Sequence, residues 1–210
     1  MAISSHVKRI GRGRAEKQSV ILEAAIEEFA RFGYKGASIT NIAKRAGMPR
    51  PNLHYYYSSK LRLYQQILMN ILELWNSTFD GISAGDDPGK VISEYIHAKV
   101  MYSKTNPLAS KIFAMEIIHG GVNLGEFLKN DYKQWLKEKT SIIEQWALAG
   151  KMDPIDPHHL MFMIWGSTQF YADFSVQVES GLNMASLDDL QYENIAKTIA
   201  QVILKGCGIK

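Results

Sequence analysis

Ala37–Tyr57 reads ASITNIAKRAGMPRPNLHYYY, and this stretch decides the expected fold. Its pattern predicts a helix that starts at Ser38, a sharp turn at Gly47 and a short second helix that ends at Tyr56. Gly47 supplies the positive φ that such a turn favours. Two helices joined by a glycine-containing turn are typical of a helix-turn-helix, whose second helix enters the DNA major groove.

The second helix of this motif carries basic, amide and aromatic side chains. Leu53 and Tyr57 are spaced to face the interior, whereas exposed aromatic groups on so short a helix are typical of contacts with sugars and phosphates. We expect Arg50 and Asn52 to contact base edges. The same surface is expected to include Pro51 and His54, with phosphate contacts from Ser38, Thr40, Tyr55, Tyr56 and Lys60. The alternative is that Tyr55 belongs to the core with Tyr57.

The positive charge of the chain is concentrated around this motif. The formal net charge of all 210 residues is +3. Residues 1–60 hold 11 Lys and Arg against 4 acidic residues, a net charge of +7, so residues 61–210 have a net charge of −4. This division favours a polyanion as the partner of the first segment. The alternative is a basic disordered tail without a binding role, because residues 8–17 supply five of the positive charges.

Helical periodicity over the rest of the chain predicts an all-α protein. A first helix is expected from Ala15 to Phe32 and ends at Gly33, and the helix after the motif is capped by Ser58 or Ser59. Asn-Pro, Asp-Pro and Gly signals divide the remainder into further helices, giving about nine in total. The later helices are predicted at 88–105, 107–119, 124–148, 157–179 and 187–205, the last with a capping box formed by Ser186 and Asp189.

The predicted helices group into three parts. Residues 1–14 contain glycine, serine and basic residues, and we expect a flexible basic arm there. Residues 15–60 are expected to form an N-terminal three-helix DNA-binding domain of the helix-turn-helix type. Residues 61–210 are expected to form a C-terminal helical domain for ligand binding and dimerisation.

Composition and length exclude several classes of protein. Hydrophobic residues make up 46% of the chain and charged residues 21%, which is an ordinary globular composition. The single cysteine, Cys207, excludes an internal disulfide framework and a cysteine-based zinc finger. The longest apolar run, Leu160–Trp165, is far shorter than the roughly 20 residues of a membrane span, and the N-terminus lacks a signal-peptide core. We therefore expect a cytoplasmic protein with no membrane partner.

Three blocks around the helix-turn-helix carry a resemblance to a known family. They are FARFGYKG (Phe29–Gly36), IAKRAG (Ile42–Gly47) and NLHYYYSSK (Asn52–Lys60). In residue types and spacing they resemble the TetR family of transcriptional repressors, and they depart from the family pattern at Met48-Pro49, His54 and Leu61. The resemblance implies a homodimer that binds double-stranded operator DNA and a small-molecule effector.

The C-terminal half resembles one subgroup of that family, the regulators of pyrimidine utilisation. The matching blocks occur in the same order: ILELW at 71–75, EYIHAK at 94–99, FAMEI at 113–117 and the stretch 154–179. This resemblance implies a repressor that is released from DNA by uracil or thymine. It also implies that Trp75 and Gln169 contact the pyrimidine.

Side chains in the stretch 157–179 suit a pocket for a small planar ring. Such a pocket needs flat apolar walls and a few hydrogen-bonding groups, and the candidates are Trp75, Trp165, Gln169, Tyr171 and Asp173. The amide of Gln169 offers a donor and an acceptor together, which matches the N–H and C=O edge of uracil. The alternative for each aromatic residue is a place in the core or at a dimer interface. The nine methionines favour a larger hydrophobic ligand as the alternative effector.

No residue pattern supports catalysis, a metal site or a cofactor. His97, His119, His158 and His159 have no i, i+4 partner arrangement, and Gly11-Arg12-Gly13 lacks the strand and the GK[ST] of a phosphate loop. Ser141 and Ser167 have no partners for a catalytic triad. We expect that the protein is not an enzyme. Two other classes stay open, a helical interaction protein that binds no DNA and a helical enzyme with its active site in the C-terminal pocket.

The last two long helices are expected to form a homodimer interface. The predicted helix 157–179 has apolar residues on more than one face, and such a helix must be buried on both sides. A second copy related by a two-fold axis would cover the outer side with a four-helix interface. That axis would place two recognition helices roughly 34–36 Å apart, about one turn of DNA.

Overall fold

The computed structural model describes the backbone of residues 2–209 and the side chains of residues 13–209. This part of the chain contains helices and no strand, so the all-α prediction is confirmed, with eleven α-helices in place of about nine. They are α1 (Ala2–Gly36), α2 (Ile39–Arg45), α3 (Arg50–Tyr56), α4 (Lys60–Asn76), α5 (Pro88–Thr105), α6 (Pro107–Ile118), the 3-10 helix η1 (Val122–Leu124), α7 (Gly125–Lys129), α8 (Asp131–Leu148), α9 (Pro157–Asp173), α10 (Ser175–Leu182) and α11 (Asp189–Gly206).

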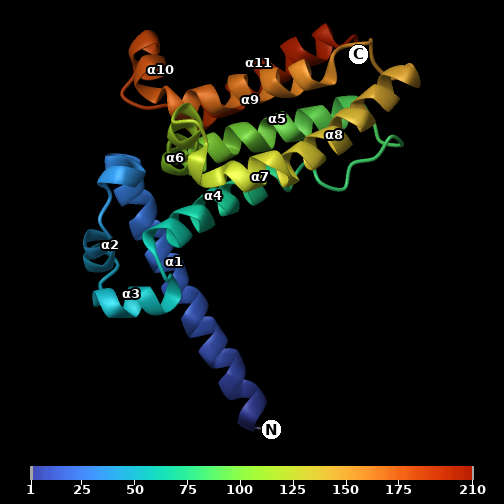
Figure 1. Ribbon diagram of the computed structural model, residues 1–210. Helices are drawn as coiled ribbons and strands as arrows, with labels where there is room; N and C mark the ends of the chain where they lie inside the picture. Colours follow the sequence, from blue (N-terminus) through green and yellow to red (C-terminus); the bar gives the residue numbers. More distant parts are fainter. Residues whose placement is uncertain (1, 210) are drawn as a thin grey trace.

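Helices α1, α2 and α3 pack with the start of α4 into an N-terminal lobe (Figure 1). Phe29 of α1, Ile42 of α2 and Leu53 of α3 are fully buried in it. Each lies on an apolar stripe of its helix, so burial of the three stripes against one another fixes the arrangement. The turn between α2 and α3 passes through Gly47 at a φ of 65°, and the predicted helix-turn-helix domain is confirmed.

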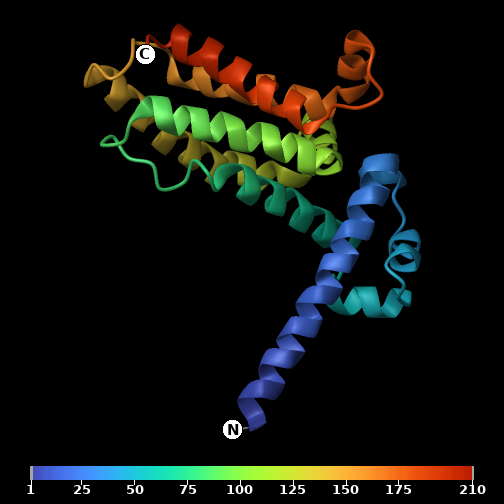
Figure 2. The same cartoon turned by 180° about the vertical axis from the view of Figure 1, so that it is seen from behind.

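Helices α5, α8, α9 and α11 form a bundle, and α6 lies at the end of it that faces α1 (Figures 1 and 2). Tyr95, Trp146 and Leu160 are almost completely buried in its core. Asp87 and Asp156 cap α5 and α9 with their side chains, as the Asp-Pro pairs predict. No helix among the described residues combines the length and the apolarity that a membrane crossing needs.

Helix α4 belongs to both parts of the molecule. Near its start, Tyr64 packs edge-on against Phe29 of α1 at a ring-centroid distance of 4.8 Å. Near its end, Trp75 packs edge-on against Phe113 of α6 at 4.9 Å. One hydrophobic cluster therefore runs from α1 through α4 to α6, and the expected boundary after residue 60 falls in the first turn of the helix that joins the two parts.

The basic N-terminal segment is helical, whereas the sequence predicts a separate arm over residues 1–14 and a helix from Ala15. Helix α1 begins at Ala2, and its regular part ends at Gly33, where φ is 65°. Extending an existing helix adds a hydrogen bond per residue without a new nucleus, which outweighs the cost of about 1 kcal/mol for each glycine there. The segment projects beyond α3 (Figure 2). Met1, the first residue of the expected arm, lies outside the described residues.

Two predicted long helices are each divided. The predicted helix 124–148 is broken at Asn130, between α7 and α8, where ψ is −81°. The predicted helix 157–179 is broken at Phe174, between α9 and α10. At this second break, Ser110 and Lys111 of α6 bond to the side chains on either side of Phe174, so a tertiary contact overrides the helical pattern.

The N-terminal cap of the last helix differs from the prediction. The capping box is formed by Asp188 and Gln191, whose side chains each accept a backbone N–H of the other, and it replaces the expected pair Ser186 and Asp189. Both pairs have the three-residue spacing of the motif. The longer Gln191 side chain reaches back to the cap residue, as the usual Glu or Gln of this motif does.

Candidate functional site

The predicted DNA-contact residues share the outer surface of α2 and α3. Thr40, Arg50, Asn52 and Tyr55 are exposed, as are Pro51 and His54, and Tyr56 and Ser38 are half-buried. Tyr55 is 73% exposed whereas Tyr57 is 8% exposed. The inward position predicted for Tyr57 is therefore confirmed, and the alternative of a core position for Tyr55 is wrong.

The basic end of α1 lies beside this surface. The Arg14 guanidinium is 5.9 Å from the ring centroid of Tyr55, and the Arg50 Nε donates to Nε2 of His54 at 3.4 Å. A hollow of about 420 Å³ between α1 and α3 is lined by Lys17, Asn52, Tyr55 and Tyr56, among others. Cationic, amide and hydroxyl donors thus converge where α3 can meet the grooves and phosphates of a duplex.

Lys60 has a structural role that the sequence does not reveal. Its Nζ donates to the backbone oxygens of Lys35 at 3.3 Å and Ala37 at 3.0 Å, and it lies 4.9 Å from the ring centroid of Tyr34. These contacts fix the connection between α1 and α2. The DNA contact expected of Lys60 stays a prediction, and neutralising this residue would disturb the lobe as well as any phosphate contact.

Glu28 anchors the first helix of the helix-turn-helix. This residue of α1 is only 1% exposed, and its Oε1 accepts hydrogen bonds from the backbone N of Ser38 and from Nδ2 of Asn41, both at 3.1 Å. Arg45 lies 3.8 Å from its Oε2. Ser38 therefore stands at the N-cap position, but its hydroxyl makes no capping hydrogen bond, and the carboxylate of Glu28 holds the start of α2 through Ser38 N and Asn41.

Replacing Glu28 by alanine is expected to destabilise the protein by about 2–3 kcal/mol, because the backbone N–H of Ser38 and the side chain of Asn41 both lose a buried, charged acceptor. The neighbouring Glu27 bonds to Arg45 at 2.6 Å on the exposed surface, and Glu27→Ala should cost less than about 1 kcal/mol. Urea unfolding followed by circular dichroism measures both changes. Equal losses in the two variants would contradict the role given to Glu28.

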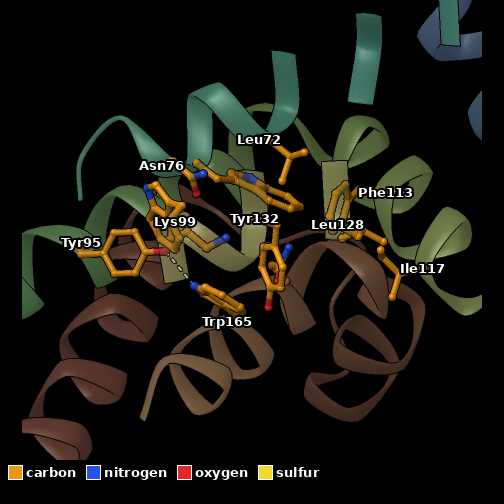
Figure 3. Close-up of a pocket in the computed structure, with 12 residues that line it drawn as sticks. Leu72, Asn76, Tyr95, Lys99, Phe113, Ile117, Leu128, Tyr132 and Trp165 are labelled. Atoms are coloured by element: carbon orange, nitrogen blue, oxygen red, sulfur yellow. Dashed lines mark hydrogen bonds between the residues drawn. The ribbon is translucent and has the colours of Figure 1, made fainter. Parts of the chain in front are cut away.

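A cavity of about 380 Å³ lies between α4, α5, α6, α7, α8 and α9 (Figure 3). The structure brings three of the five predicted ligand residues, Trp75, Trp165 and Gln169, to its wall. Most of the wall is apolar or aromatic, and the remaining lining residues are Leu72, Asn76, Tyr95, Lys99, Phe113, Ile117, Leu128, Tyr132 and Trp135. The cavity thus has the flat apolar walls and few polar groups that suit a planar ligand.

Tyr171 and Asp173 do not line this cavity, which corrects the prediction for both. Two residues beyond Gln169 on a helix, Tyr171 faces the other side, where its ring packs edge-on against Phe170. Asp173 lies on the same face of α9 as Gln169, but one helical turn further along. There it accepts a hydrogen bond of 2.6 Å from Oγ of Ser110. Burial raises the pKa of Asp173, and its hydrogen bond with Ser110 opposes that effect.

Lys99 and Asn76 are cavity residues that the sequence prediction missed. Lys99 is 2% exposed, and its Nζ lies 3.9 Å from the ring centroid of Trp75. Burial lowers the pKa of Lys99 to about 7, an effect that the charge of Asp173 partly offsets. The spacing of the residues does indicate that Lys99 is buried, because Lys99 stands seven residues after Ile92 and four before Ser103, on the buried stripe of α5.

The polar groups at the cavity wall are able to form hydrogen bonds with a ligand. Among the described residues, no hydrogen bond is made by the side-chain amides of Gln169 and Asn76 or by Nζ of Lys99. Oη of Tyr95 accepts a hydrogen bond from Nε1 of Trp165 at 2.7 Å, which fixes the orientation of that indole in the cavity wall. The arrangement offers amide donors and acceptors beside one ammonium group, between aromatic faces.

No three His, Cys, Asp or Glu side chains in the described chain converge as metal ligands would.

Comparisons with known proteins cover both lobes. Residues 21–67 match the family described as bacterial regulatory proteins, tetR family, and residues 68–210 match the family described as YcdC-like protein, C-terminal region. The HTH-type transcriptional regulator RutR of Escherichia coli K12 is 37% identical over 205 residues, which cover 98% of this chain and 96% of that protein. The TetR-family regulator PfmR from Thermus thermophilus has a similar structure, with a TM-score of 0.69 at 16% identity over 88% of this chain and 97% of that one.

Proposed function

We propose that this chain, which belongs to the TetR family of bacterial transcriptional regulators, is a dimeric repressor. It leaves its operator when uracil or thymine binds. That it is a DNA-binding regulator and not an enzyme follows from the family. The single observation that carries the proposal is the cavity of Figure 3, where aromatic walls surround amide groups with no protein partner.

The polar groups of the cavity match the edge of a pyrimidine dione. Uracil and thymine alternate N–H and C=O around one edge, and the amides of Gln169 and Asn76 each provide a donor and an acceptor. The rings of Trp75, Trp165 and Tyr132 provide flat surfaces against which the heterocycle can stack. The blocks at 71–75, 94–99, 113–117 and 154–179, which resemble the pyrimidine-utilisation regulators, include most of these residues.

The size of the cavity favours a compact effector over a large hydrophobic one. At about 380 Å³ it is near the lower end of ligand pockets, which run from roughly 300 to 1,000 Å³. A long aliphatic ligand would also leave Lys99 and Gln169 buried without hydrogen bonds, which costs about 1–3 kcal/mol for each group. None of the described residues that line the cavity is a methionine.

The outer surface of α9 and α11 supports a homodimer. Phe162, Met163 and Phe170 on α9 are 46%, 52% and 37% exposed, and Leu190 and Val202 on α11 are 67% and 64% exposed. Large apolar side chains gathered on two neighbouring helices favour burial against a partner. We propose that a second copy supplies that cover around a two-fold axis, so that two α3 helices face one duplex.

Helices α4 and α6 connect the cavity to the DNA-binding lobe. Trp75 stands in the last turn of α4, and Phe113 and Ile117 of α6 also line the cavity. The buried Glu116, also on α6, accepts hydrogen bonds from the backbone N and Nδ2 of Asn123. Burial raises the pKa of Tyr64 on α4, and the carboxylate of Glu116 raises it further. A ligand that shifts this wall would move α4 and α6 against α1 and change the spacing of the two recognition helices.

Gln169→Leu is expected to weaken uracil binding by about ten- to a hundredfold, because it removes the amide and keeps the bulk. Isothermal titration calorimetry measures the affinity, and thermal unfolding without ligand checks that the variant is folded. Gln145→Leu makes the same change on the exposed side of α8, away from the cavity, and serves as the control. Wild-type affinity in Gln169→Leu would show that the proposed site is wrong.

The repressor function is tested by release from DNA. Uracil added to the wild-type protein on its operator should lower the fluorescence anisotropy of the labelled duplex, and cytosine should not. Cytosine is the matched ligand because it replaces one ring carbonyl and N–H by an amino group and an acceptor nitrogen. Tighter DNA binding in the presence of uracil would contradict release by the effector.

A further inference from the structure

Lys99 is a buried cation without a close counter-charge. Among the described residues that line the cavity it is the only one with a charged side chain. The Nζ faces the cavity between Tyr95 and Tyr132 (Figure 3) and contacts the ring of Trp75 at 3.9 Å. A buried ammonium group is normally paired with a carboxylate, because removing its charge from water is costly.

The groups around Lys99 do not supply that pairing. Helix α4 presents Trp75 and Asn76, α8 presents tyrosine and tryptophan, and α9 presents Trp165 and Gln169, all of which are neutral. The carboxylate of Asp173 forms no ion pair with Lys99; it acts on Lys99 only through its charge at longer range, and it accepts a hydrogen bond from Ser110. The positive charge of Lys111 also acts on the carboxylate of Asp173, which Lys99 therefore does not have to itself. The part of the cavity beside Nζ is therefore the place where the negative charge of a ligand would be most strongly stabilised.

We propose that Lys99 selects ligands that bind as anions, and that the preferred class is planar imide heterocycles with an acidic ring N–H. This inference rests on the proposed function, since it concerns the same cavity and narrows its ligand class. The ring nitrogen gives up its proton, and the negative charge is shared by the adjacent carbonyl oxygens. A neutral Lys99 amine takes up that proton, whereas a charged Lys99 keeps its own and the ring proton passes to solvent.

The resulting contact is an N⁺–H···O⁻ bond inside an apolar cavity. Such a bond is about twice as strong as one between neutral groups, and a low local dielectric strengthens it further. The amides of Gln169 and Asn76 bond to the rest of the ring edge whether or not the ligand is charged. The shape of the cavity and the amide contacts thus allow any such ring to bind. The contact with Lys99 makes the binding affinity increase with the acidity of the ring N–H group.

The test compares thymine with 5-bromouracil, since bromine is close to methyl in size and makes the ring N–H more acidic. Wild-type protein at pH 7 is expected to bind 5-bromouracil at least about fivefold more tightly than thymine in calorimetry. Lys99→Met, which keeps the length and removes the charge, should bring this ratio close to one. Lys104→Met, on the same helix but paired with Asp189 outside the cavity, should keep the wild-type ratio.

A second readout uses the wild-type protein and does not depend on how well a variant folds. The ¹⁹F resonance of bound 5-fluorouracil at pH 7 should lie at the position of the deprotonated ring, because ionisation changes the shielding of the fluorine. A bound resonance at the neutral position would overturn the inference. So would equal wild-type affinities for thymine and 5-bromouracil, or a preference that persists in Lys99→Met. These outcomes leave the proposed function standing, whereas a wild-type protein that binds neither ligand overturns both.

Discussion

Replacing Arg50 and Tyr55 together by alanine is expected to weaken operator binding by at least about a hundredfold. An arginine that bonds to a guanine edge contributes about 1–3 kcal/mol of discrimination, and a tyrosine hydroxyl on a phosphate adds a positioning contact. Both side chains are exposed on α3, and Tyr55 is 73% exposed, so neither helps to hold the lobe together. Fluorescence anisotropy with a duplex selected by the wild-type protein from a random pool measures the loss.

The control for this variant removes positive charge elsewhere. Lys133 and Lys137 are exposed on α8, in the other lobe, and their replacement by alanine lowers the net charge by two. If long-range charge alone held the DNA, this control would lose as much affinity as the α3 variant. An α3 variant that binds the selected duplex as tightly as the wild type would show that another surface reads the DNA.

Gly166→Arg is expected to convert the proposed dimer to a monomer and to lower operator affinity by about 10²–10⁴-fold, through the loss of bivalent binding. Gly166 is exposed on α9 among Phe162, Met163 and Phe170, and a Cβ added there would meet nothing within 4 Å apart from its chain neighbours and the backbone of α9 itself. Arginine also favours a helix more than glycine does, so the protomer itself should stay folded. In the proposed interface the new side chain would occur twice, once on each copy.

Sedimentation equilibrium distinguishes the outcomes of this second test. The variant should sediment as a monomer of 23.7 kDa and the wild type as twice that mass. Ser141→Arg places the same side chain on the exposed surface of α8 and should remain dimeric. A wild-type protein that is monomeric at micromolar concentration, or a Gly166→Arg variant that remains dimeric, would exclude α9 as the dimer surface.

Local signals explain why much of the DNA-binding lobe could be predicted. The positive φ of Gly33 and Gly47 and the side-chain cap of Ser59 depend on residues close in sequence, and each occurs where the pattern placed it. The inward position of Leu53 and Tyr57 follows from helical spacing alone. The sequence pattern predicts the start of α1 too late in the chain. Helix propagation from a well-packed region tolerates glycines, whereas the local pattern indicates that the helix is broken there.

The ligand cavity was predicted only in part, because its residues come from six helices that are far apart in the sequence. Trp75, Trp165 and Gln169 were found through the resemblance and through side-chain chemistry, whereas Asp173 was misplaced by one helical turn. Lys99 was missed because a lysine is ordinarily exposed, and composition treats it as part of a solvated surface. Only its place on the buried stripe of α5 distinguished it.

By itself, the sequence determined the helical fold, the helix-turn-helix and the concentration of positive charge beside it, because periodicity, caps and turns act within a few residues. The tertiary structure alone decided where the buried charges lie and what they contact. Glu28 and Lys99 both lie on the buried stripes of their helices, yet Glu28 accepts hydrogen bonds from residues of the helix-turn-helix and Lys99 faces the cavity. That difference depends on which distant segment supplies a partner, and no local pattern contains this information.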